Sequence, residues 1–298
     1  MFTRRDLGRI ALGAFAAERL LGKPNSTIRG VTVGIHSRSF RDRPLDKALA
    51  AMVQVGIASC ELWEGHVAPP RLSRGGLREW RENIAIEQFQ VVASEFAQAG
   101  VKIFAYNYEL SEDSSEREIQ RGFEMTKALG TTLITMTPPM KLIPTLAAAA
   151  LKAGMFVGIR NGDRTEAGVA SSPADLSAVA TANAGAGICL DLGDFTAAGY
   201  DPLKALTGNA FRLFAVYLRD RRGDHGPSLV YGQGNTPLAA VLKQIQGSKL
   251  KIEPVIDYDY AAPDPVIEVE RCFAFCRQVL MARFPAEPAA AAEPAIAP

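Results

Sequence analysis

Short apolar runs alternate with longer amphipathic stretches along most of the chain, and this alternation constrains the fold more than any other feature. The apolar runs predict strands at 31–36, 58–62, 101–106, 131–136, 155–160, 187–191, 213–218 and 252–257. The amphipathic stretches predict helices at 45–55, 77–99, 113–129, 142–153, 174–184, 202–206, 237–246 and 265–282. Glycines end several of these helices, as expected of a left-handed helix stop, at Gly56, Gly100, Gly130 and Gly154.

Strands that alternate with helices pair in parallel through right-handed crossovers, and eight such units can close into a barrel. The sequence therefore predicts a single (β/α)8 TIM barrel. The alternative is an open doubly wound sheet, which usually carries a glycine-rich phosphate loop after its first strand. Here His36 leads directly into Ser37, with no such loop, so the barrel is favoured.

Composition narrows the possible partners. The 298 residues are 48% hydrophobic and 22% charged, which is typical of a globular domain of barrel size. A net charge of +1 gives no electrostatic reason to expect nucleic acid or an anionic membrane as a partner. Four cysteines in a chain of this length predict buried structural thiols and no disulfide scaffold.

The two ends of the chain differ from the middle. Residues 1–27 carry Arg4 and Arg5 ahead of a short apolar run, which resembles a twin-arginine export signal. We therefore expect a periplasmic or secreted protein, or a cytoplasmic one if this segment is only a flexible or amphipathic N-terminus. Residues 28–284 form the predicted barrel, and 285–298 are a Pro/Ala tail with little to pack. No stretch reaches the roughly 18–20 apolar residues that span a bilayer.

Polar residues gather where the predicted strands end, which is the face that carries the active site in TIM barrels. Asp191 ends an apolar strand, where an unpaired carboxylate would be costly, so it must face a partner. The candidate ligand-binding residues at the other strand ends are His36, Trp63, His66, Tyr106, Asn161, Tyr217 and Arg219. Aromatic rings, carboxylates and guanidinium groups together suit a small carbohydrate.

Several segments match a known family in their order and spacing. They are Gly56–Leu62, Ile188–Gly193, Val216–Asp220, Gly232–Asn235 and Val255–Asp259. Over about 31–282 the chain resembles the sugar isomerase/epimerase-like proteins of the xylose isomerase-like TIM barrel superfamily. The resemblance implies a barrel that acts on a small sugar, and in the metal-dependent members a divalent cation bound by Glu, Asp, His and Glu from strands five to eight.

At the matching positions this chain has Arg160, Asp191, Tyr217 and Asp257. A guanidinium cannot ligate a cation, and two carboxylates alone would hold only a weak Mg²⁺ or Mn²⁺ site. We therefore expect no tightly bound metal cofactor, with Arg160 beside Asp191 and Asp257 in the electrostatic role of the ion.

Three interpretations remain open. In the first, a sugar isomerase, epimerase or lyase works without metal: Asp191, Asp257, Glu61 or a histidine moves the proton, and Arg160 stabilises an oxyanion. In the second, an exported barrel binds a sugar without turning it over. In the third, Asp163 or Asp194 rebuilds a metal site. The charged residues could also form a structural ion network that closes the mouth, and the protein could be a monomer or a homodimer.

Overall fold

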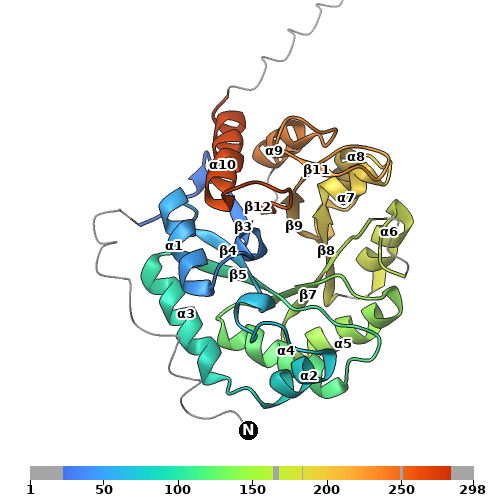
Figure 1. Ribbon diagram of the computed structural model, residues 1–298. Coiled ribbons are helices and arrows are strands. Elements are labelled where there is room, and N and C mark those ends of the chain that lie inside the picture. The colour runs from blue at the N-terminus through green and yellow to red at the C-terminus, as the bar shows by residue number, and fades with distance from the viewer. Residues whose placement is uncertain (1–22, 164–167, 183, 249–250, 283–298) are drawn as a thin grey trace, which may run out of the picture.

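The computed structural model describes residues 23–163, 168–182, 184–248 and 251–282, and it is a closed barrel of eight parallel strands. The predicted TIM barrel is confirmed. The strands, in their order around the barrel, are β12 (Glu253–Ile256), β3 (Gly34–His36), β4 (Ser59–Trp63), β5 (Lys102–Asn107), β6 (Leu133–Met136), β7 (Phe156–Arg160), β8 (Ala186–Asp191) and β9 (Leu213–Leu218). Figure 1 shows helices on the outside of this ring of strands.

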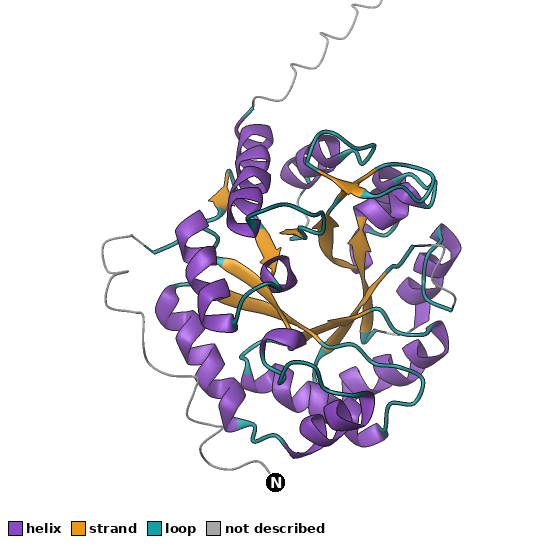
Figure 2. Ribbon diagram, in the orientation of Figure 1, coloured by secondary structure: helices purple, strands orange, loops and turns teal. Residues whose placement is uncertain are grey.

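The helices follow the strands as predicted and cover the barrel on all sides (Figure 2). Their bounds are α1 (Leu45–Val55), α2 (Arg74–Asn83), α3 (Glu87–Ala99), α4 (Glu116–Ala128), α5 (Ile143–Ala153), α6 (Pro173–Ala182), α7 (Leu192–Ala197), α8 (Pro202–Gly208), α9 (Leu238–Gly247) and α10 (Pro265–Met281). Short 3-10 turns lie at Ser37–Phe40, Glu64–His66, Met140–Leu142 and Ala210–Arg212.

Alternation along each strand decides which side chains enter the barrel. On β8, Cys189 packs in a small interior cluster with Tyr217 and Val255. Asp191 lies two residues further and so points to the same side. Gly158 on β7 leaves room for this interior packing, because a Cβ there would come within 2.5 Å of Cys189 Sγ. Arg160, two residues beyond Gly158, therefore also enters the barrel mouth.

The structure differs from the sequence prediction at three places. The expected strand 31–36 is interrupted, because β2 (Val31–Thr32) folds back on β1 (Thr27–Ile28) as an antiparallel hairpin below the barrel. The expected helix 77–99 is two helices, α2 and α3, separated at residues 84–86. A short helix that was not predicted, α7, starts directly after β8, and Asp191 caps it by accepting a hydrogen bond from Asp194 N at 2.9 Å.

The predicted export signal lies almost wholly outside the described residues, and so does the Pro/Ala tail. Within the part of the chain that the structure describes, no helix combines the length and the hydrophobicity needed to cross a bilayer. All four cysteines are buried and free, at Cys60, Cys189, Cys272 and Cys276.

Candidate active site at the barrel mouth

A guanidinium group lies between two buried carboxylates at the centre of the mouth. Arg160 Nη2 is 2.5 Å from Asp191 Oδ2 and donates a second, shorter hydrogen bond to Asp257 Oδ2. Asp191 and Asp257 are 0% and 1% exposed, and Arg160 is 9% exposed. This contact was expected from the sequence: Arg160 and Asp191 end β7 and β8, and Asp257 directly follows β12.

The backbone around Asp191 is held from the neighbouring strand end. Asn161 Oδ1 accepts a hydrogen bond from Asp191 N at 2.7 Å, and Asn161 Nδ2 donates to Asp191 O at 3.2 Å. Asn161 is 1% exposed. Its amide therefore fixes the position of Asp191, whereas the sequence analysis expected it to bind the ligand.

Below the guanidinium lies a second interior layer. The Arg160 Cζ atom is 4.0 Å from the centre of the Tyr217 ring, a distance typical of a cation–π contact. Tyr217 Oη donates to Glu61 Oε1 at 2.6 Å, and Thr135 Oγ1 donates to the same oxygen. The other carboxylate oxygen, Glu61 Oε2, is buried and has no partner among the described residues.

His36 lies beside this layer at the end of β3. Its Nδ1 is 3.4 Å from Asp257 Oδ1, and its ring meets the Tyr217 ring edge-on at 6.1 Å. The side chain is buried, and within the described residues Nε2 has no hydrogen-bond partner. In the parallel pairing of β3 with β4, His36 is the register partner of Glu61, so the two unsatisfied groups belong to adjacent interior positions.

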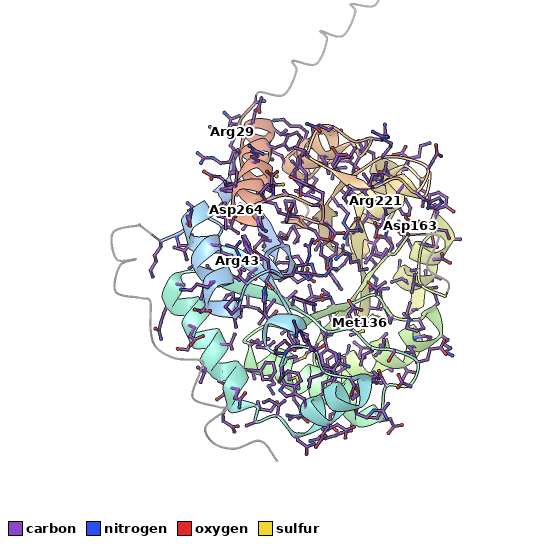
Figure 3. All side chains as sticks on the ribbon, in the orientation of Figure 1. Arg29, Arg43, Met136, Asp163, Arg221 and Asp264 are labelled. Atoms are coloured by element: carbon purple, nitrogen blue, oxygen red, sulfur yellow. The ribbon has the colours of Figure 1, made fainter. Side chains whose placement is uncertain are left out.

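Two further arginines join the mouth to its rim. Arg219 Nη2 donates to Asp257 Oδ2 at 3.1 Å, and Arg219 Nη1 donates to Asp194 Oδ1 at 2.9 Å. Arg221 Nη1 lies 2.6 Å from Asp194 Oδ1 and 2.9 Å from Asp163 Oδ2. Arg221 and Asp163 are labelled in Figure 3. Positive and negative groups thus alternate from the barrel axis to the rim.

The two central aspartates have different electrostatic surroundings. Burial acts to raise the pKa of Asp257, but Arg160, Arg219 and His36 outweigh it and hold that pKa well below its ordinary value. Burial raises the pKa of Asp191, and the nearby Asp194 carboxylate adds to the rise against the opposing arginines. Asp257 is therefore the permanently ionised member of the pair.

Three of the predicted ligand-binding residues lie outside this central group. Tyr106 is fully buried, and its ring packs against Phe89 of α3, on the helix side of the barrel wall. His66 is held by Ser37 Oγ at 2.9 Å and by the Phe40 carbonyl oxygen at 3.2 Å, and burial lowers its pKa. The Trp63 ring meets the His66 ring at 5.4 Å.

The contacts at the rim of the site were not predictable from the sequence. Asp163 and Asp194 were considered as possible metal ligands, but both pair with Arg221, and His225 Nδ1 lies 2.5 Å from Asp163 Oδ1. These contacts join residues far apart in sequence, through loops with no periodic pattern. The sequence feature that indicates part of the rim is the spacing of Asp191 and Asp194, which is typical of a capped helix start and so predicts that the two residues lie close together.

The residues at the mouth do not fit the divalent metal that the family resemblance implies. The Arg160 guanidinium fills the position between Asp191 and Asp257, and the hydroxyl of Tyr217 is committed to Glu61. Asp163 and Asp194 are each paired with Arg221. Nowhere in the described residues do three or more His, Cys, Asp or Glu side chains group so that they could hold a metal ion.

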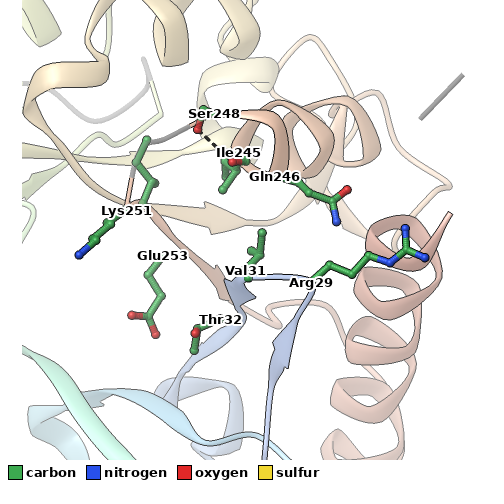
Figure 4. Close-up of a pocket in the computed structure, with 10 residues that line it drawn as sticks. Arg29, Val31, Thr32, Ile245, Gln246, Ser248, Lys251 and Glu253 are labelled. Carbon is green, nitrogen blue, oxygen red and sulfur yellow. Dashed lines mark hydrogen bonds between the residues drawn. The ribbon is translucent and has the colours of Figure 1, made fainter. Parts of the chain in front are cut away.

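Two cavities lie away from this centre. One, of about 710 Å³, lies beside the mouth between the loops after β3 and β4, and Trp63 and His66 line it. The other, of about 490 Å³, lies at the opposite end of the barrel, which we call the floor. Its lining includes Arg29, Lys251 and Glu253 (Figure 4). Burial raises the pKa of Glu253 to about 7.

The fold is that of the xylose isomerase-like TIM barrels, as the sequence resemblance predicted. No protein-family model and no curated protein sequence matches the chain. Among solved structures, 3-keto-D-glucoside 4-epimerase YcjR from E. coli is 16% identical, with a TM-score of 0.62, over 83% of this chain and 99% of that one.

Two other solved structures are similar to the same degree. An L-ribulose 3-epimerase is 15% identical with a TM-score of 0.62, over 84% of this chain and 94% of that one. The IOLI protein with a bound zinc atom is 15% identical with a TM-score of 0.61, over 84% and 96%. At this level of identity the similarity establishes the fold, and the function has to be inferred from the residues of the site.

Proposed function

We propose that the protein is a carbohydrate isomerase or epimerase in which Arg160 takes the electrostatic role of a metal ion. The observation that carries this proposal is the position of the guanidinium between two buried carboxylates at the strand ends. Both contacts use Nη2, and no described residue accepts a hydrogen bond from Nη1 or Nε. These remaining N–H groups can bind a sugar carbonyl oxygen and stabilise it as negative charge develops.

Isomerisation and epimerisation next to a carbonyl need a group that removes a proton and one that returns it. His36 and Glu61 are the best placed, because each is buried, faces the barrel interior and has one polar atom without a partner among the described residues. A hydrogen bond from His36 Nδ1 to Asp257 leaves Nε2 as a proton acceptor. Asp191 and Asp257 then hold Arg160 and His36 in position.

A specific observation favours the second function, a barrel that binds a sugar without turning it over. Asp191, Asp194 and Asp257 are all paired with Arg219, and the two proton-transfer candidates Glu61 and His36 are only 0% and 2% exposed. Product analysis by NMR separates the two functions, because a binding protein would retain the sugar unchanged.

The test is a calorimetric and thermal-shift screen of aldoses, ketoses and their keto derivatives, with and without Mn²⁺. We expect a sugar-dependent stabilisation of the wild-type protein that needs no Mn²⁺ and is absent in Arg160→Ala and Asp191→Asn. Arg121→Ala is the control. Arg121 is also buried, but it lies on α4, outside the barrel, where it pairs with Glu124 and donates to the carbonyl oxygen of Arg81. A sugar response kept by Arg160→Ala, or one that needs Mn²⁺, would contradict the proposal.

A further inference from the structure

The cavity beside the mouth has no role in the chemistry proposed above, yet its size and lining are those of a ligand site. Its volume of about 710 Å³ is in the range of roughly 300–1,000 Å³ that is common for small-molecule pockets. One sugar ring at Arg160 would not fill it. We propose that this cavity is a second sugar subsite, so that the ligand is a disaccharide or another glycoside; this proposal rests on the proposed function.

Trp63 connects the cavity to the mouth. It ends β4 two residues after Glu61 and so points to the same side of the barrel wall, and it also lines the cavity. Its backbone N–H donates to Ser37 Oγ at 2.8 Å. Its indole lies against Gly65, where an added Cβ would come within 2.3–2.5 Å of the ring. The ring is thus held as a fixed, partly exposed platform, which is what the apolar face of a sugar needs.

The polar groups of the cavity wall are largely neutralised within the wall. Arg43 pairs with Asp42 at 2.8 Å, and Arg81 pairs with Glu64 at 2.5 Å. The carboxylate of Glu109 accepts hydrogen bonds from Asn107 Nδ2 at 3.0 Å and from Thr137 N at 2.9 Å. Paired charges of this kind can still exchange hydrogen bonds with hydroxyl groups. Among the described lining residues Arg71 has no ion-pair partner, but Arg41, Arg43 and Arg81 are paired, which favours an uncharged ring over a phosphate.

A chain of ion pairs links the cavity rim to the central guanidinium. Arg41, in the cavity lining, lies 3.8 Å from Asp259, and Asp259 lies 3.2 Å from Arg219. Arg219 in turn contacts Asp257, the partner of Arg160. The cavity that Trp63 and Arg41 line is therefore joined to Arg160 by a continuous series of polar contacts, along which a second ring linked to a sugar at Arg160 could extend.

Binding of paired sugars tests this proposal. The probes are glucose against cellobiose and maltose, galactose against lactose, and xylose against xylobiose, each titrated by calorimetry and by tryptophan fluorescence. The chain has two tryptophans, so Trp80→Phe leaves Trp63 as the single reporter and serves as the matched control. We expect at least tenfold tighter binding of the linked sugar than of its single ring, with a change in Trp63 emission.

Two variants examine the same ratio of affinities. In Trp63→Ala, and in Leu77→Trp, whose larger side chain fills the cavity, the ratio of the affinity for the linked sugar to that for the single ring should fall to about one. Trp80→Phe should leave this ratio unchanged. Equal affinities for single and linked sugars in the wild-type protein would overturn the second subsite and leave the proposed function standing. A linked-sugar preference that survives both variants would also overturn it. If neither form of any sugar binds, both proposals are wrong.

Discussion

The two ends of the barrel bury carboxylates in different ways. At the mouth, Asp257 lies within hydrogen-bonding distance of Arg160 and Arg219, and its pKa is held well below the ordinary value. At the floor, Glu253 points into the barrel at the start of β12, and no ion pair joins it to any described residue within 4 Å. Its Oε1 is buried and has no hydrogen-bond partner among the residues that the structure describes, and burial raises its pKa to about 7.

This contrast shows that burial alone does not decide the charge of a carboxylate. Desolvation is the largest influence on both groups and acts to raise the pKa of each. The sign of the result follows from the partners: two arginines outweigh burial at Asp257, whereas a hydrogen bond from Ser59 and the more distant charge of Lys102 do not outweigh it at Glu253. Asp257 at the mouth therefore stays ionised, whereas the floor contains a carboxyl group that changes its charge near neutral pH.

Removing the Arg160 guanidinium from the mouth should lower the stability of the protein more than a substitution of Glu253 or His225. Arg160→Ala leaves Asp191 and Asp257 buried without the group that bridges them, and loss of one partner of a buried ion pair typically costs about 3–5 kcal/mol. We expect a loss of that size in the free energy of unfolding, measured by urea denaturation at pH 7. In an Asp191→Asn/Asp257→Asn background the same change should cost much less. A loss below about 1 kcal/mol in the wild-type background would show that the carboxylates do not depend on Arg160.

Glu253 at the floor should make the stability of the protein depend on pH. The pKa of Glu253 is about 7 when folded and near its ordinary value of 4.5 when unfolded, so the native state holds the proton more tightly. Stability therefore falls as pH rises from about 4.5 to about 7 and stays low above that range. The size of the fall is about 3 kcal/mol at 1.36 kcal/mol per pKa unit.

The Glu253→Gln variant should lack this component of the pH dependence in urea unfolding measured from pH 5 to pH 8. Its free energy of unfolding should exceed that of the wild-type protein at pH 8, and this difference should shrink toward pH 5. Glu270→Gln, on the exposed face of α10, is the matched control and should follow the wild-type curve. Parallel curves for wild type and Glu253→Gln would mean that Glu253 does not titrate in this range.

How far the sequence predicts this molecule depends on the range of the interactions. The barrel strands were predictable because a strand buried on both faces is a continuous apolar run, as in Ala186–Asp191. Arg160 was predictable as a mouth residue because it ends a predicted strand, 155–160. The end of β5 was predicted to place Tyr106 and Asn107 at the mouth, but only Asn107 faces the site, because moving by one residue along a strand changes the face that a side chain occupies. The contact of His225 with Asp163 depends on loop geometry that has no periodic signal.

Substitutions at the rim should affect the free energy of unfolding less than substitutions elsewhere in the charged network. His225 is 41% exposed in its side chain and contacts Asp163, which keeps Arg221 as a second partner. Its backbone φ of 57° favours asparagine over alanine as the replacement. His225→Asn should therefore change the free energy of unfolding by at most about 1 kcal/mol, because exposed polar contacts contribute little, and added salt should reduce any part of the difference that a protonated His225 contributes. A loss as large as that of Arg160→Ala, unaffected by salt, would mean that the rim is as tightly coupled to the barrel as the centre, and that the ion pairs from Arg160 to His225 act as one structural unit.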